Sequence, residues 1–235
     1  MIISHSHRFI FIKTQKTAGT SLEIALSEYL GQEDVLTPTD REDEELRDQL
    51  GFAGPRNYLV PLRQYTRRDL LGILDHRMKL AYFSHSPAAF IWHHIPHDIW
   101  DSYYKFAFER NPYEQAISLY FWHNRREPRP SISEWIAGGG LNVVPAPAIY
   151  TLNGEIAVDD VFRYERLADS LREIEGRLSL PKPLELPRAK SQERTDRRPY
   201  QEVLGEADRR TIEQRFAATF ESFGYAWGSD PVDRP

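Results

Sequence analysis

Short apolar runs, followed by one-sided helical patterns, organise most of this chain. Phe9–Ile12 is long enough for a buried strand, and apolar positions then recur at helical spacing from Leu22 to Leu30. The other predicted strands are Lys79–Ser84, Tyr103–Glu109 and Val158–Tyr164. Strands that alternate with helices predict an α/β fold with a mostly parallel central sheet.

Three further helical segments follow from the pattern. Asn111 is a good N-cap and Pro112 a good first residue for a helix that ends near Asn124. Glu165-Arg166-Leu167 opens a second helix, with apolar positions from Leu167 to Leu178, and the pattern predicts a single last helix over 208–223. Residues 125–160 are rich in Pro and Gly, so we expect loops there, with one short helix near 132–136.

The length of 235 residues is ordinary for one domain, so we expect a single domain over 1–235. Residues 31–79 and 125–155 read as insertions into it, and the first of them carries an acidic stretch at 40–48 that is typical of a solvated face. Insertions of this kind are where we expect an acceptor pocket to be built.

Charge and composition limit the kinds of partner and the cellular compartment that we expect. A net charge of −5 argues against a broad nucleic-acid surface, and the absence of cysteine excludes disulfides and thiolate metal sites. No leader-like segment and no apolar run near 18 residues stands in the sequence. We therefore expect a cytoplasmic protein with no transmembrane segment and no nucleic-acid partner.

The segment between the first strand and its helix has the chemistry of a phosphate cradle. Lys13–Ser21 is small, polar and basic, and Gly19 allows close backbone approach. The first N–H groups of the following helix lack internal partners and attract anions. This is not a Walker A loop, because the lysine precedes the only glycine.

The order Lys-Thr-x-Gly-Thr-Ser after a strand resembles the 5′-phosphosulfate loop of sulfotransferases that use 3′-phosphoadenosine 5′-phosphosulfate (PAPS). Arg110-Asn-Pro-Tyr, with Ser118 eight residues after the arginine, is similar to that family's second motif. The resemblance implies a three-layer fold like that of the P-loop nucleotide hydrolases. It implies that Arg110 and Ser118 hold the 3′-phosphate and that Lys16 contacts the bridging oxygen. The remaining residues implied to bind the nucleotide are Lys13, Thr17, Ala18, Gly19, Thr20 and Ser21.

The implied reaction transfers a sulfuryl group from PAPS to a hydroxyl or amine of a carbohydrate, lipid-linked or small-molecule acceptor. His85, at the end of a predicted strand, is the expected base, with Glu23 or Glu109 as alternatives. Lys190 and Arg194 lie where the family often has a loop that closes over the nucleotide. No metal is expected, because a lysine supplies the positive charge. Glu109, Gln115 and Gln15 depart from the family pattern.

Several alternatives stay open at this point. The chain could be a kinase-like P-loop enzyme, or a relative that binds nucleotide without catalysis. Arg63, Arg67 and Arg68 could contact an anionic acceptor. Zinc at His93, His94 and His97 is disfavoured, because Pro96 breaks the helix that would align them. A homodimer is neither indicated nor excluded by the sequence.

Overall fold

The computed structural model describes residues 1–67, 69–71, 79–142, 146–187 and 196–228. A five-stranded sheet in the order β3-β1-β2-β4-β7 forms its centre. The strands are β1 (Ile2–Ser4), β2 (Phe9–Ile12), β3 (Val35–Leu36), β4 (Tyr104–Glu109) and β7 (Asp160–Arg163). A separate hairpin pairs β5 (Thr151–Leu152) with β6 (Glu155–Ile156).

The sheet is mixed, so the prediction of parallel strands holds for its core and not for its antiparallel edge. β2, β4 and β7 are parallel neighbours, but β1 pairs antiparallel with both β2 and β3. The predicted strand at 79–84 is wrong, because this segment contributes only an isolated bridge between Ala81 and Leu59. The place beside β2 that it would need is already taken by β1.

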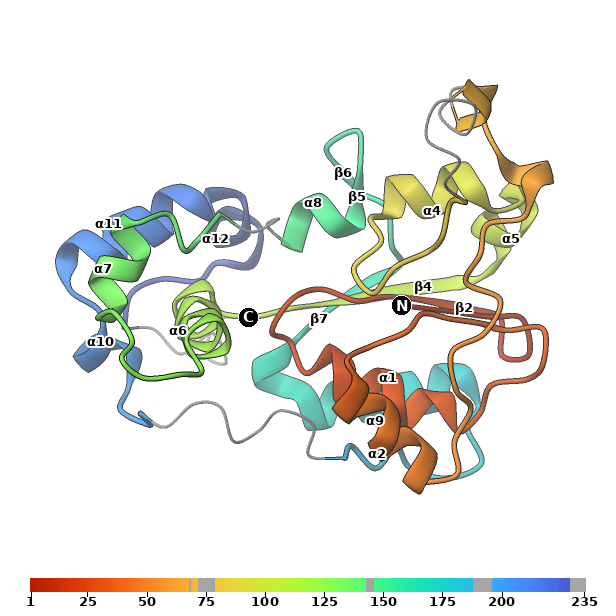
Figure 1. The fold of residues 1–235 in the computed structure, drawn as a ribbon, viewed down its shortest axis with the longest axis horizontal. Helices are drawn as coiled ribbons and strands as arrows, with labels where there is room; N and C mark the ends of the chain where they lie inside the picture. Colours follow the sequence, from red (N-terminus) through yellow and green to blue (C-terminus); the bar gives the residue numbers. More distant parts are fainter. Residues whose placement is uncertain (68, 72–78, 143–145, 188–195, 229–235) are drawn as a thin grey trace.

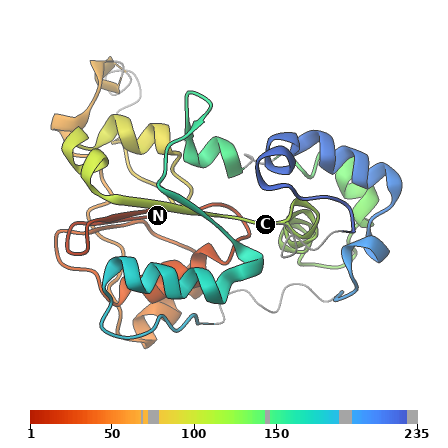
Figure 2. The same ribbon diagram turned by 180° about the vertical axis from the view of Figure 1, so that it is seen from behind.

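Helices cover both faces of the sheet (Figures 1 and 2). One face carries α4 (Ala88–His94), α5 (His97–Ser102) and α8 (Ala146–Tyr150). The other carries α1 (Gly19–Ser27), α2 (Arg41–Gln49) and α9 (Leu167–Leu178). The α/β class is therefore confirmed, and within the described residues no helix is both long and apolar enough to cross a bilayer.

Successive side chains of the buried strands point to opposite faces of the sheet and contribute to two hydrophobic cores, one on each face. Ile10 and Ile12 of β2 pack on the face that α4 and α5 cover, while Phe9 and Phe11 pack on the face of α1 and α9. Because both faces are covered, the strand is apolar throughout, as a buried parallel strand must be.

A third core lies beyond the end of the sheet, around α6 (Pro112–His123). Its other helices are α7 (Ile132–Ala137), α10 (Tyr200–Val203), α11 (Glu206–Arg215) and α12 (Ala217–Phe223), which gather beside α6 in Figure 1. The single last helix predicted over 208–223 is in fact two, because Phe216 leaves helical geometry at φ −112° and ψ 26°. Short 3-10 turns lie at Leu62–Gln64 and Tyr164–Arg166.

Candidate functional site

The carboxyl ends of β2 and β4 place two polar loops side by side, as open parallel sheets commonly do at binding sites. The first loop, here called the lysine loop, is Lys13–Ala18 between β2 and α1. The second is the turn Arg110–Asn111 between β4 and α6. Asn111 accepts a hydrogen bond from the N–H of Tyr113 at 3.0 Å, so the predicted N-cap is confirmed.

Three hydrogen bonds join the lysine loop to the β4–α6 segment. The hydroxyl of Thr14 donates to the Phe108 carbonyl at 2.5 Å. The Gln115 amide donates to the Gln15 carbonyl at 2.8 Å. Arg110 Nη1 donates to the Lys16 carbonyl at 3.0 Å. Three consecutive loop residues are thus each fixed by a different group of one segment.

The lysine loop also has an unusual backbone. Lys16 and Ala18 have φ values of 60° and 58°, in the left-handed region that residues with a Cβ rarely adopt. Such conformations cost roughly 1–3 kcal/mol each and persist where surrounding contacts impose them. The contacts from Phe108, Gln115 and Arg110 supply that constraint.

Gly19 begins α1 and lies against Lys13. A Cβ on Gly19 would come within 2.8 Å of Lys13 Cγ. The lysine cannot easily move, because its Nζ lies 2.5 Å from Oε2 of the buried Glu23. Glycine is therefore required here by close packing, and its φ is ordinary.

Glu23 is a buried acceptor for several groups and does not face the site. Its Oε1 accepts from the Met1 amine at 3.0 Å and from the Thr37 hydroxyl at 3.2 Å. Burial alone would raise the pKa of this carboxyl, but the Met1 amine and Lys13 lower it. Glu23 does not line the anion pocket and both of its oxygens are already engaged, so the structure offers no support for Glu23 as the alternative base.

Arg110 is held from three sides. Besides its bond to Lys16, its Nη2 lies 3.5 Å from Glu114, and its guanidinium carbon lies 4.5 Å from the centre of the Tyr164 ring. The arginine is therefore fixed before any ligand arrives. Ser118 follows two turns later on α6 and lines the same pocket.

A pocket of about 560 Å³, here called the anion pocket, opens over these groups. Every predicted site residue that the structure describes lines it; Lys190 and Arg194 lie outside the described residues. Those predicted residues are Lys13, Lys16, Thr17, Ala18, Gly19, Thr20, Ser21, His85, Arg110 and Ser118. Their placement in one pocket is shown, and their roles in binding and catalysis stay predictions.

Other lining residues were missed by the sequence analysis. They are Thr14, Gln15, Leu119, Trp122, His123, Tyr164, Leu167, Leu186 and Pro187. Two of them carry signals that could have been used. Trp122 lies four residues after Ser118 on the same helix, and Tyr164 directly follows the parallel strand β7.

Two cations lie over the ring of Trp122, and one of them, Lys16, lines the pocket. Lys16 Nζ lies 4.9 Å and the Arg125 guanidinium carbon 3.5 Å from the centre of its ring. Burial, together with the nearby Lys16 charge, lowers the pKa of His123. This side of the pocket thus favours an anion.

His85 reaches the pocket although the strand predicted to carry it does not exist. Its Nδ1 lies 2.9 Å from the Lys13 carbonyl, which can only accept, so Nδ1 carries the proton. Burial and the nearby Lys13 charge lower the pKa of His85 to about 4. At neutral pH the ring is uncharged, and Nε2 keeps a lone pair that can accept a proton.

Glu109, which departs from the family pattern, does not line the anion pocket. It is fully buried and accepts from the Arg110 N–H at 3.0 Å and from the Tyr150 hydroxyl at 3.0 Å. Burial raises its pKa to about 7. Because Glu109 does not line the pocket, we do not retain it as a base.

The histidines at 93–97 form no metal site in the structure. His94 Nδ1 lies 2.7 Å from the Phe90 carbonyl and its Nε2 3.0 Å from Asp69. Among the described residues, no three His, Asp or Glu side chains are grouped so that they could hold a metal ion.

Comparisons with known proteins give one relative. Over 105 residues, which are 43% of this chain and 88% of the other, the sequence is 26% identical to a protein of Archaeoglobus fulgidus described as an uncharacterized protein. No family model matches the chain. No solved structure matches it either.

Proposed function

We propose that this chain is a sulfotransferase that moves a sulfuryl group from PAPS to a hydroxyl or amine of a carbohydrate, lipid-linked or small-molecule acceptor and releases 3′,5′-ADP. One observation carries the proposal. Lys16 and Arg110 come from loops 94 residues apart, yet they line one pocket and are joined by a 3.0 Å hydrogen bond.

The residues of the anion pocket fit a nucleotide with phosphate groups at two ends. The lysine loop and the start of α1 offer cationic, hydroxyl and backbone N–H donors, and Arg110 with Ser118 offers a second set. Tyr164, Leu167 and Leu186 add apolar surface suited to an adenosine. A volume of about 560 Å³ lies within the ~300–1,000 Å³ usual for small-molecule sites.

Each residue then has a defined task. When bound, PAPS supplies the sulfuryl group, whose bond to the phosphate oxygen breaks as the acceptor oxygen or nitrogen bonds to sulfur. The Lys16 ammonium would stabilise charge on the departing phosphate oxygen, where one well-aimed donor is worth ~3 kcal/mol. Arg110 and Ser118 would hold the 3′-phosphate. Lys13, whose Nζ is paired with Glu23, would shape the lysine loop and add little free charge.

His85 would accept the acceptor's proton through Nε2. The hydrogen bond from Nδ1 to the Lys13 carbonyl fixes the required tautomer. A positioned base typically contributes ~10²- to 10⁴-fold, and a base whose pKa is lowered to about 4 belongs toward the lower end of that range, because the ideal pKa lies near the operating pH.

Thermal-shift measurements with 3′,5′-ADP, 5′-AMP and ATP plus Mg²⁺ test the proposal. At a hundred times its Kd, a ligand adds ~2.7 kcal/mol to the free energy of unfolding, or roughly 5–10 °C in Tm for a chain of this size. We expect 3′,5′-ADP to stabilise the protein more than 5′-AMP does, because only the former has a 3′-phosphate for Arg110.

Stabilisation by ATP plus Mg²⁺ without stabilisation by 3′,5′-ADP would overturn the proposal in favour of a kinase-like enzyme. If 3′,5′-ADP binds, a panel of hydroxyl and amine acceptors with labelled PAPS separates a transferase from a non-catalytic relative.

A further inference from the structure

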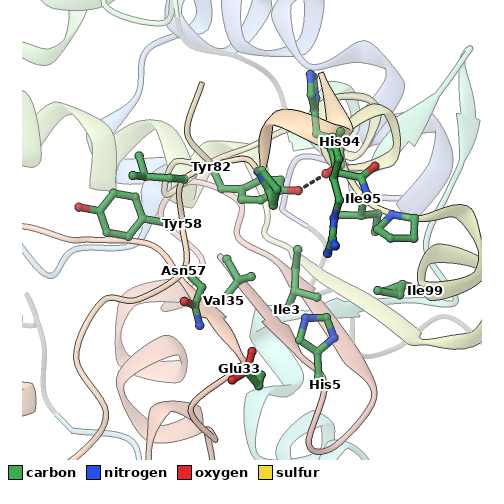
Figure 3. A pocket seen from close by; sticks show the side chains of 15 residues that line it. Ile3, His5, Glu33, Val35, Asn57, Tyr58, Tyr82, His94, Ile95 and Ile99 are labelled. Atoms are coloured by element: carbon green, nitrogen blue, oxygen red, sulfur yellow. Dashed lines mark hydrogen bonds between the residues drawn. The ribbon is translucent and has the colours of Figure 1, made fainter. Parts of the chain in front are cut away.

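A second pocket, also of about 560 Å³, lies against the antiparallel edge of the sheet (Figure 3). Ile3 of β1 and Val35 of β3 belong to its apolar lining, together with Tyr58, Tyr82, Ile95 and Ile99. It shares no lining residue with the anion pocket among the described residues. We call it the edge pocket.

Two polar side chains of the edge pocket are already paired within the protein. Both ring nitrogens of His94 face acceptors, and the Asn57 amide donates to the carbonyls of Gln32 and Asp34. Arg63 and Glu33 are exposed, and within the described part of the chain neither forms an ion pair or a side-chain hydrogen bond. The lining therefore offers one guanidinium and one carboxylate, beside the side chains of His5 and Gln64.

Two exposed leucines belong to the segment that lines this pocket. Leu59 lines the pocket and is 50% exposed, and Leu62 is 71% exposed between two lining residues, Pro61 and Arg63. Apolar surface gathered at the mouth of an apolar cavity indicates a ligand that is itself largely apolar.

From the cavity and its rim together, we infer that the edge pocket binds an anionic amphiphile, a small molecule with an apolar body and one anionic head group. The body packs against Ile3, Val35 and Tyr82, and the head pairs with Arg63. A guanidinium on a long apolar stem suits this position, because it spans apolar surface and binds a carboxylate, sulfate or phosphate in a bidentate way.

The carboxylate of Glu33 limits how many anionic groups the ligand can carry. It lies beside His5 at one end of the pocket in Figure 3. A second anionic group on the ligand would meet this carboxylate, so one head group is expected. The inference does not rest on the proposed function, because binding at the edge pocket needs no nucleotide.

Isothermal titration of the full chain with dodecanoate, below its micelle concentration, tests the inference. We expect saturable binding at one site per chain, and weaker binding of the neutral dodecanol. Arg63→Gln should weaken dodecanoate binding about 1.5- to fivefold, the usual range for an exposed charge pair, and Glu33→Gln should strengthen it. Both side chains are exposed, so both variants should fold.

Two further variants place the ligand. Leu59→Ala removes a lining side chain and should weaken binding, whereas Leu71→Ala, 69% exposed and outside the pocket lining, is the matched control and should not. Ile99→Trp should fill the pocket and abolish binding. If Ile99→Trp fails to fold, Arg63→Gln and Glu33→Gln still test whether dodecanoate binds at the edge pocket.

The inference fails if dodecanoate shows no saturable binding, if Arg63→Gln leaves the affinity unchanged, or if dodecylamine binds more tightly than dodecanoate.

Discussion

Arg110 donates a hydrogen bond from Nη1 to the Lys16 carbonyl over 3.0 Å, although 94 residues separate the two in the chain. The bond leaves the guanidinium and the ammonium in one pocket despite their like charge. Tyr164 and Glu114 lie against the guanidinium and offset that repulsion. Arg110 thus has two tasks, because it shapes the lysine loop and presents a cation to an anionic ligand.

Arg110→Ala should weaken binding of 3′,5′-ADP by about ten- to hundredfold, since hydrogen bonds to charged groups are worth ~1.5–3 kcal/mol. A phosphate clamp acts equally in ground and transition states, so KM for the donor should rise more than kcat falls. Titration calorimetry and steady-state kinetics measure the two effects. Arg172→Ala, on the exposed side of α9, is the control. An isolated loss of kcat with unchanged 3′,5′-ADP affinity would contradict this role.

Lys16→Ala should lower transfer by ~10²-fold or more while the protein stays folded and still binds 3′,5′-ADP. Lys16 contacts the Trp122 ring and lies on the surface of the pocket, so truncation leaves the core intact. A labelled-PAPS assay and the Tm together separate chemistry from folding. Lys182→Ala, 60% exposed, serves as the control. Turnover at the original rate would remove Lys16 from the mechanism.

The acid limb of kcat/KM should lie near pH 4. The folded pKa of His85 is lowered to about 4 by burial, so the ring is neutral and able to accept a proton at all higher pH values. His85→Ala should lose ~10²-fold or more across this range, and the exposed His93→Ala should keep activity. A limb near pH 6.5 that survives in His85→Ala would assign the base to another group.

Glu109→Gln should stabilise the protein at pH 8 and leave stability unchanged near pH 4.5. Burial raises the folded pKa of Glu109 to about 7, so its favourable contribution is fully present below the ordinary value of 4.5 and is lost as pH rises through 7. Glutamine mimics the protonated form, and the gain at pH 8 is on the order of 3 kcal/mol. Denaturant unfolding at both pH values measures it. Equal effects at the two pH values would mean that Glu109 does not titrate in this range.

Gly19→Ala should destabilise the lysine loop, although alanine normally favours a helix by roughly 1 kcal/mol. Its Cβ would meet Lys13 at 2.8 Å, and Lys13 is held by Glu23. Gly176→Ala in α9 is the matched control, because no atom lies within 4 Å of its Cβ position, and it should stabilise the chain. We expect opposite signs in Tm for the two variants; a gain in both would show that Lys13 can move aside.

Much of the fold could be predicted from strong local signals in the sequence. β2 was predicted with its observed bounds from four consecutive apolar residues, and α9 from apolar positions up to Leu178, although its start was placed at Glu165 and not at Leu167. The cap at Asn111 and Pro112 located the start of α6. In each case the residues that decide the element lie within a few positions of one another.

Long-range pairing explains what the sequence could not show. β1 and β3 have three and two residues, too few for any period, and exist because they pair with each other and with β2. The segment at 79–84 looks like a strand locally but has no free sheet edge to join. The helix break at Phe216 has no Gly or Pro to mark it.

The grouping of the candidate site residues in one pocket followed from two short motifs. Lys16 and Arg110 each belong to a motif that comes after a parallel strand, β2 or β4, and their roles stay predictions. His85 was chosen for a strand that is not there, and it reaches the pocket through its bond to the Lys13 carbonyl. The edge pocket had only Arg63 as a signal, because its apolar lining comes from segments far apart in the chain.

The lysine loop is held in shape before a ligand binds, and this affects the kinetics of binding. Its residues Thr14, Gln15 and Lys16 are fixed by Phe108, Gln115 and Arg110. A loop already shaped by the rest of the molecule gives up little disorder on association, so less of the contact energy is spent on arranging it. Association should therefore proceed in a single kinetic phase, without a slow rearrangement after the first encounter.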